Sequence, residues 1–335
     1  MLRLRTASMF QVLLLLLVLT LVIVGCGNNN TGSTTPVETK VFPEKALEYV
    51  AHTNPGDGAD IFARKFIQIA ENNNISLGQP IYVVNKVGGS GVVAFTYVAS
   101  KRGDPHYLQA AQMSLITAPL NRGAKFYWKD DFTMIANLVE DAKVLAVSAN
   151  SPYYTVDDLK QAAQSKPINF GGGLAGGSDQ IVGFSFAKAI GGDIEYIPFG
   201  GGGESLASLL GGDLDVISAN PMEVMSPYEA GQVRLVGIVS ANRNPALPDV
   251  PTLVEQGYDV TIAPNRGVAA PAGISEEARS ALVKYFKDLT ETDEWKEYCL
   301  EAALTPAFYG GNDFTEYMQR MEDTLVPILK EMGQI

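Results

Sequence analysis

Two kinds of apolar spacing alternate along most of this chain. Short, nearly continuous apolar runs are typical of buried strands, whereas apolar residues three or four positions apart are typical of helices. Because the two kinds alternate, the pattern predicts an α/β fold with mostly parallel sheets. The expected strands cover residues 47–53, 81–84, 107–113, 143–148, 168–170, 194–199, 213–218, 233–240 and 259–263.

Helical spacing is clearest in four segments. Residues 61–72 carry phenylalanines and isoleucines on one predicted face. Residues 180–190 are apolar nearly all round, which predicts a buried helix. Later in the sequence, we expect a helix that opens at Ser275 and a last helix that ends before Pro327.

Glycine-rich turns follow three of the expected strands, at residues 53–60, 171–179 and 199–205. Each turn leaves free N–H groups at the positive end of the next helix, which is a favourable place for an anion. None of the three turns contains Lys or Arg. The sequence therefore predicts anion capture by amides, helix dipoles and water. The alternative is that each turn is only a tight connection between a strand and a helix.

These turns and the residues near them supply the candidate ligand contacts. Four candidates are acids on or next to first helical turns, where the alternative role is capping and dipole compensation. Arg266 is the basic residue nearest the expected domain crossover and a candidate for holding a ligand carboxylate. The full candidate set is Asn54, Gly56, Asp57, Gly58, Asp60, Ser114, Ile116, Gly173, Ser178, Asp179, Gly201, Gly202, Glu204 and Asn220.

The second turn also matches a dinucleotide fingerprint. Its pattern is Gly171-x-Gly173-x-x-Gly176, with Glu195 nineteen residues after Gly176. The alternative function is therefore an exported NAD-dependent oxidoreductase. Other catalytic patterns are absent from the sequence, which has no Walker motif and only two histidines, His52 and His106, without metal-ligand spacing. We expect no metal and, in the main interpretation, no cofactor and no catalysis.

The first residues of the sequence have the pattern of a secretory signal. Arg3 and Arg5 precede an apolar run over residues 9–24, which is shorter than the roughly 20 residues that a spanning helix needs. The run ends Ile-Val-Gly-Cys at Cys26, which resembles the bacterial lipobox. That resemblance implies cleavage before Cys26 and lipid attachment to its sulfur. We therefore expect a signal peptide at 1–25 and a flexible tether at 26–43; the alternative is an uncleaved anchor.

Charge and cysteine content narrow the class of protein. The net charge is −12, which argues against a nucleic-acid partner. With Cys26 acylated, only Cys299 remains, so no intrachain disulfide is possible. Stability must come from a core, and 46% hydrophobic residues can supply one. A surface lipoprotein that binds a macromolecule through an exposed apolar patch stays open as a third class.

Several motifs together resemble the extracytoplasmic solute receptors of tripartite tricarboxylate transporters, also called Bug receptors. The segment 243–252, Arg-Asn-Pro-Ala-Leu-Pro-Asp-Val-Pro-Thr, is the most specific match. The resemblance covers most of the chain from about residue 47 onward. Its other motifs lie at residues 54–60, 78–91, 196–202, 209–215 and 270–273.

The resemblance implies a periplasmic-binding-protein fold of type II, with two α/β domains joined by two crossing strands and a ligand cleft between them. It implies domain 1 at 44–145 and 261–335, and domain 2 at 146–260. It also implies a monomeric receptor that binds a small carboxylate without catalysis and delivers it to a two-component membrane permease. The expected location is outside the cytoplasmic membrane.

Three positions depart from the family pattern. Asp57 replaces a usual glycine, Asp179 with Gln180 replaces a usual small polar residue and His, and Glu204 replaces a usual small residue. Each departure adds an acid where a dicarboxylate's oxygens would lie, and like charges in a closed cleft raise the free energy. The sequence therefore favours a zwitterion, or a monocarboxylate with hydroxyl or amine groups, over citrate.

Overall fold

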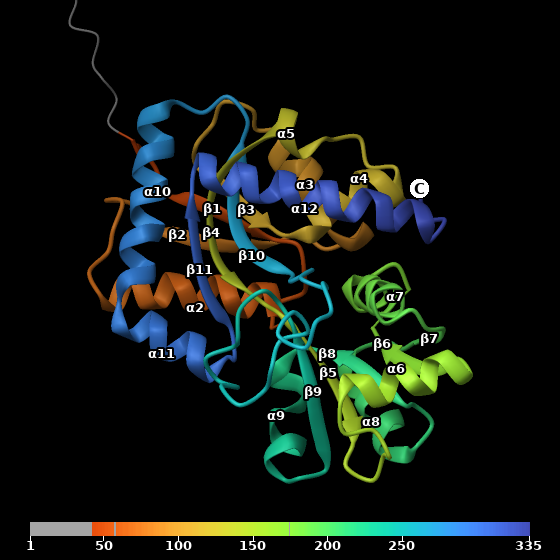
Figure 1. Cartoon of the computed structure of the whole chain (residues 1–335). Helices are drawn as coiled ribbons and strands as arrows, with labels where there is room; N and C mark the ends of the chain where they lie inside the picture. The colour runs from red at the N-terminus through yellow and green to blue at the C-terminus, as the bar shows by residue number, and fades with distance from the viewer. Residues whose placement is uncertain (1–41, 57, 174) are drawn as a thin grey trace, which may run out of the picture. The chain divides into compact units, whose positions relative to one another are not determined.

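The computed structural model describes residues 42–335 except Asp57 and Leu174. The predicted signal peptide, the lipid site at Cys26, nearly all of the tether and the candidate contact Asp57 lie outside the described residues. Within the described part of the chain, the strands form two sheets with helices packed on them, which confirms the predicted α/β class (Figure 1).

The larger sheet has the strand order β11-β4-β10-β3-β1-β2. β1 pairs in parallel with β2 and β3, whereas β10 is antiparallel to β3 and β4. The carboxyl ends of β1, β2 and β3 therefore meet at one edge of the sheet, the edge where open α/β sheets bind ligands. The strands are β1 (Leu47–Ala51), β2 (Ile81–Asn85), β3 (Tyr107–Ala111), β4 (Phe132–Glu140), β10 (Asn265–Pro271) and β11 (Thr305–Gly310).

The smaller sheet has the strand order β7-β6-β8-β5-β9. β6 is parallel to β7 and β8, and β5 is antiparallel to β8 and β9. The carboxyl ends of β6, β7 and β8 again share an edge. The strands are β5 (Lys143–Ser148), β6 (Ile168–Gly172), β7 (Ile194–Pro198), β8 (Val216–Ala219) and β9 (Val233–Val239).

The chain passes between the two sheets twice. The first passage is the short link 141–142 between β4 and β5, and the second is the longer segment 240–264 between β9 and β10. We call these the short passage and the long passage. Two passages thus join two sheets that have largely separate cores.

Each sheet is covered on both faces, because alternate strand residues point to opposite sides. On the larger sheet, Leu47 and Tyr49 of β1 join a core with α2, α10 and α11, whereas Val50 joins a core with α3, α4 and α12. The helices of the larger-sheet half are α2 (Gly58–Asn72), α3 (Val92–Ala99), α4 (Met113–Arg122), α5 (Trp128–Asp131), α10 (Glu276–Glu291), α11 (Asp293–Glu301) and α12 (Asn312–Glu331), with a 3-10 turn η1 (Gly89–Gly91).

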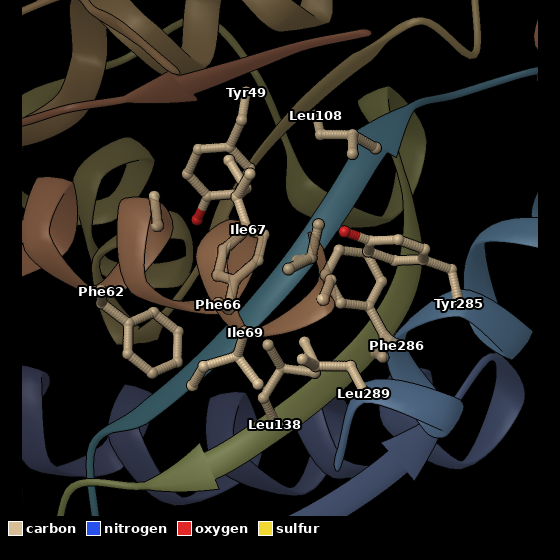
Figure 2. Close-up of a cluster of buried hydrophobic side chains, with 14 of the residues drawn as sticks. Tyr49, Phe62, Phe66, Ile67, Ile69, Leu108, Leu138, Tyr285, Phe286 and Leu289 are labelled. Carbon is tan, nitrogen blue, oxygen red and sulfur yellow. The ribbon is translucent and has the colours of Figure 1, made fainter. Parts of the chain in front are cut away.

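Aromatic residues hold α2 to its neighbours. Figure 2 shows Phe66 and Ile69 of α2 facing Phe286 and Leu289 of α10. The rings of Phe66 and Phe286 meet edge to face with centroids 5.5 Å apart, a favourable geometry for aromatic pairs. This core fixes α2, and with it the glycine-rich turn at its N-terminus.

The smaller sheet is built the same way. Leu145 and Val147 of β5 join a core with α6 and α7, and Val144 and Ala146 join a core with α8 and α9. These helices are α6 (Val156–Ser165), α7 (Ser178–Ile190), α8 (Gly202–Gly211) and α9 (Pro221–Glu229). The N-termini of α7 and α8 follow β6 and β7 directly, as the sequence predicts.

Three predictions are wrong. The sheets are not mostly parallel, because the strands beside the two passages, β4, β5, β9 and β10, pair antiparallel with their neighbours. Residues 259–263, expected as a strand, belong to no sheet, because they run along the long passage and make local hydrogen bonds such as Ala263 N to Thr261 O at 2.8 Å. The last helix does not end before Pro327 but continues to Glu331. A buried stripe including Leu325 and Leu329 holds α12 against the core on both sides of that proline.

Candidate functional site

A cleft of about 270 Å³ lies between helices that belong to the two sheets. One wall is one side of α4 along most of its length, and the other is the start of α7 with the turn before it. The cleft therefore has walls from both halves of the fold, and the end of the long passage closes it. Its polar lining residues include Ser114, Thr117 and Asn121 from α4, Gly176 and Ser178 from the α7 side, and Asn265 from β10.

The N-terminus of α4 lies on this cleft without a side-chain cap. Its N-cap residue Gln112 makes no capping hydrogen bond. The hydroxyl of Ser114, the second residue of α4, is buried and has no hydrogen-bond partner among the described residues. A buried hydroxyl without a partner is costly, so it favours a ligand that can pair with it. Free amides, the helix dipole and this hydroxyl all favour an anion.

The N-terminus of α7 lies on the opposite wall and also lacks a side-chain cap. Gly177 is its N-cap residue and Ser178 its first residue. The preceding turn is held from within, because the Gly176 amide donates to Gln180 Oε1 at 2.7 Å. The two helix N-termini thus supply backbone donors to one cleft from two halves of the fold.

Two amide oxygens give the cleft acceptors as well. Asn265 Nδ2 donates to Ala111 O at 2.9 Å and to Asn137 Oδ1 at 3.0 Å, which fixes its orientation. Its Oδ1, like Asn121 Oδ1, is buried without a partner among the described residues. None of the described residues that line the cleft is charged. The site can bind a small molecule that has both an anionic group and a hydroxyl or amine donor.

The negative charge of Asp179 is neutralised by Lys143, a residue that the sequence analysis did not identify. Lys143 Nζ lies 2.9 Å from Asp179 Oδ1, and both side chains are mostly buried. Asp179 also accepts from Ser218 Oγ and from the Gly173 amide, both at 2.9 Å. The expectation that Asp179 adds negative charge to the cleft is wrong, because the ion pair neutralises it. Its contacts hold the 171–179 turn in place.

The negative charge of Asp60, at the start of α2, is likewise neutralised by a neighbouring cation, Arg64. Asp60 is 2% exposed and accepts from the Gly56 amide, Arg64 and Asn85, each at 2.9 Å. The Arg64 hydrogen bonds, helped by those from Gly56 and Asn85, lower the pKa of Asp60 to about 2. Its carboxylate is committed to shaping the 53–60 turn. Contact between Asp60 and a ligand stays a prediction.

Arg266 ties that turn to the short passage. Its Nη2 lies 2.6 Å from Asp141 Oδ2, and its Nη1 donates to the Gly58 carbonyl at 3.1 Å. The guanidinium is thus paired with a carboxylate of the short passage. Burial, with a smaller effect of Arg266, lowers the pKa of nearby His52 to about 4. The His52 ring packs against Phe95 with centroids 5.4 Å apart.

The third turn is organised around two glutamates. Glu204 Oε2 accepts from the Gly200 amide at 2.9 Å, and Glu223 Oε2 accepts from the Asn220 amide at 2.9 Å. Glu223 lies so close to Gly202 that a Cβ there would come within 2.2 Å of it. Gly201, Gly202, Glu204 and Asn220 therefore form one group at the starts of α8 and α9, and none of them lines the cleft.

Of the described candidates, Ser114 and Ser178 line the cleft. Ile116 is on α4 but its side chain is buried in the core with α12, because it faces the sheet. Asn54, Gly56, Gly58 and Asp60 are grouped at the start of α2. Gly173 and Asp179 support the turn before Ser178. Sequence reasoning missed Thr117, Asn121, Lys143 and Asn265, although Asn265 directly follows Pro264 beside the recognised Arg266.

Packing and hydrogen bonds within this fold explain the glycines of the dinucleotide fingerprint. A Cβ at Gly171 would come within 2.4 Å of Leu214, and the Gly173 and Gly176 amides are already bonded to Asp179 and Gln180.

The described His, Cys, Asp and Glu side chains form no group that could hold a metal ion. Cys299 is buried, and burial raises the pKa of its thiol to about 12. In the described part of the chain, no helix has the length and apolar character to span a membrane.

A two-lobed α/β fold with a neutral cleft between uncapped helix N-termini defines a solute-binding receptor. The chain belongs to the tripartite tricarboxylate transporter receptor family, whose model matches residues 65–334. It is therefore a receptor and not an enzyme, and the NAD-dependent alternative is wrong.

Individual relatives agree with this assignment. A Cupriavidus necator protein, described as the UPF0065 protein in the gbd 5' region, is 25% identical over 295 residues, covering 87% of this chain and 89% of the relative. A TctC solute binding protein from Polaromonas, solved without ligand, has a TM-score of 0.78 and 25% identity, covering 87% of this chain and 99% of that one. Rpa4515 of R. palustris, solved with adipate, has a TM-score of 0.73 and 22% identity, covering 87% and 98%.

Proposed function

We propose that this receptor binds a small organic acid with a hydroxyl or amine substituent in the cleft between α4 and α7. The observation that carries the proposal is that two uncapped helix N-termini, from the two halves of the fold, face one cleft that contains the unpartnered Ser114 hydroxyl. Amides and a hydroxyl bind a carboxylate without a cation, as anion sites at helix N-termini do.

Two asparagine oxygens in the cleft are the reason for proposing a hydroxyl or amine substituent on the acid. Asn265 Oδ1 and Asn121 Oδ1 need donors, and a plain dicarboxylate offers none at neutral pH. A hydroxyl or ammonium group on the ligand would satisfy them. The adipate bound to the relative Rpa4515 supports a carboxylate ligand in this fold, and the cleft volume of about 270 Å³ supports a small one.

We further propose that ligand binding closes the two halves about the two passages and that the closed receptor delivers its ligand to a two-component membrane permease. The domain ranges 44–145 with 261–335, and 146–260, belong to this proposal. So do monomeric action and a lipid anchor at Cys26 that holds the receptor outside the cytoplasmic membrane. Metabolic labelling with a radioactive fatty acid, in the native chain and in Cys26→Ser, tests the anchor: label on both would overturn it.

The binding proposal is tested with acids of equal length. Succinate, malate and aspartate have the same carbon chain and differ in carrying no substituent, a hydroxyl or an ammonium. We expect calorimetric titration to show malate or aspartate binding at least several-fold more tightly than succinate. Equal binding of all three would contradict the role of the two asparagines.

A pair of variants locates the site. Ser114→Ala removes one hydrogen bond to a charged group, so the preferred acid should bind roughly 10-fold or more weakly. Ser280→Ala, at an exposed serine of α10, is the matched control and should bind as the native protein does. If Ser114→Ala also binds normally, the acid does not bind at this cleft.

A further inference from the structure

A second cavity, of about 400 Å³, lies where the passages between the sheets meet α12. It shares no lining residue with the cleft between α4 and α7. Its walls come from the end of β4, from Ala241 and residues 261–263 of the long passage, and from β11 and α12. Nothing in the proposed acid-binding site uses these residues.

Glu140 provides the negative charge of this cavity. It is the last residue of β4, and burial raises the pKa of its carboxyl. Its carboxylate accepts from Ser240 Oγ at 3.5 Å, which is at the outer limit of a hydrogen bond. Among the described residues, no Lys, Arg or His lies within ion-pair distance of it. A half-buried carboxylate with so weak a partner favours a ligand that brings a positive charge.

Two stacked tyrosines lie beside this carboxylate. The rings of Tyr309 and Tyr317 are 5.1 Å apart between centroids and inclined by 22°. Burial raises the pKa of both phenols, and the negative charge of Glu140 raises them further, so both rings are neutral at physiological pH. The face of a tyrosine ring attracts cations, and ammonium groups bind well where a carboxylate and aromatic rings meet.

Arg320 limits what kind of cation can bind. It lines the cavity from α12, but its side chain is largely exposed and lies 3.9 Å from Glu316. A second positive charge on the ligand would meet this guanidinium. The remaining walls include the apolar side chains of Ile262, Met321 and Leu325. The chemistry of the walls therefore fits one positive charge on a short apolar body.

We propose that this cavity is a second binding site, which takes a small organic monoammonium ion between Glu140 and the Tyr309–Tyr317 pair. The ammonium donates to the Glu140 carboxylate and lies against the tyrosine rings, and the apolar body packs against Ile262 and Met321. This proposal does not depend on the identity of the acid in the other cleft.

Isoamylamine and isocaproate test the site, because they have similar branched apolar bodies and opposite charges. In calorimetric titrations of the full chain, we expect saturable binding of isoamylamine and none of isocaproate. Glu140→Gln should weaken amine binding at least 10-fold, and Arg320→Gln, which removes the opposite charge from the same cavity, should leave it equal or several-fold stronger.

Folding is checked in each variant by its thermal midpoint, and the acid cleft by its affinity for malate. Should Glu140→Gln fail to fold, Tyr317→Leu replaces it, with an expected several-fold loss of amine affinity. The proposal is overturned if the native chain binds no amine, if isocaproate binds as well as isoamylamine, or if the substitution at Glu140, or its replacement at Tyr317, leaves amine binding unchanged.

Discussion

Lys143 and Asp179 form a buried ion pair, with Lys143 Nζ 2.9 Å from Asp179 Oδ1, directly beneath the turn that leads into α7. Lys143 begins β5 just after the short passage, and Asp179 holds the Gly173 amide. The pair thus fixes one wall of the cleft relative to the point where the chain enters the smaller sheet. It also explains how an acid is accommodated so close to an anion site.

Removing the lysine should be strongly destabilising. Lys143→Met leaves the Asp179 carboxylate buried without its cation, and breaking a buried pair from one side costs about 3–5 kcal/mol of unfolding free energy. Urea unfolding followed by circular dichroism measures this. Lys188→Met, which breaks the exposed pair with Glu331, is the control and should cost about 1 kcal/mol or less. Equal losses in the two variants would show that the buried pair is not structural.

Asp60 should make stability depend on acid pH. Its folded pKa is about 2, below the usual value of 3.8, because the carboxylate accepts from Arg64. A depressed folded pKa stabilises the native state above the ordinary pKa, and this contribution is lost as pH falls from about 4 to about 2. Asp60→Asn should therefore lower stability at pH 6 and show a weaker dependence between pH 4 and 2. Parallel pH curves for the two proteins would contradict the assignment.

The sequence left two roles open for Glu204, selection of the ligand and capping of a helix. Its exposed carboxylate accepts from the Gly200 amide in the first turn of α8, which is the geometry of a dipole partner. It is also one of the three acids that depart from the family pattern, which makes it a candidate for selecting the ligand. Glu204→Ala should change the ratio of malate to succinate affinity if it selects ligand. A drop of about 0.5–1 kcal/mol in stability with an unchanged ratio would show that it only caps the helix.

The two binding sites should influence each other. The amine cavity is lined by the end of β4 and by the long passage, so the closure that we propose would change its walls. Any coupling between two ligands is reciprocal. Saturating isoamylamine should therefore change malate affinity several-fold, and malate should change amine affinity by the same factor. Calorimetry of each ligand with and without the other measures both numbers; two unchanged affinities would contradict a link between the cavity and the passages.

Local patterns in the sequence predicted the parts of the fold that local interactions decide. β5 begins and ends where its apolar run does, and the turns before α7 and α8 lie at their predicted places. Residues 259–263 have the same apolar character as a strand, but no neighbouring strand pairs with them. Their position is set by the long passage between the two sheets, which apolar spacing alone does not reveal.

In the candidate site, too, local sequence revealed some residues, whereas others depend on contacts between distant segments. Ser114 was recognisable because it follows a predicted strand end, where parallel sheets bind ligands. Lys143 was not, because its partner Asp179 lies 36 residues further along the sequence and only the packing of β5 against α7 joins them. Likewise, the fit of Asn265 for a ligand depends on Asn137 and Ala111, which fix its amide from two other strands.

A crystal structure of the receptor with its preferred acid tests the central claim most directly. The account predicts the ligand between α4 and α7, with a carboxylate within hydrogen-bond distance of Ser114 Oγ and the first amides of both helices. A hydroxyl or ammonium group of the ligand should donate to Asn265 Oδ1. An acid bound with neither helix N-terminus in contact would contradict the account.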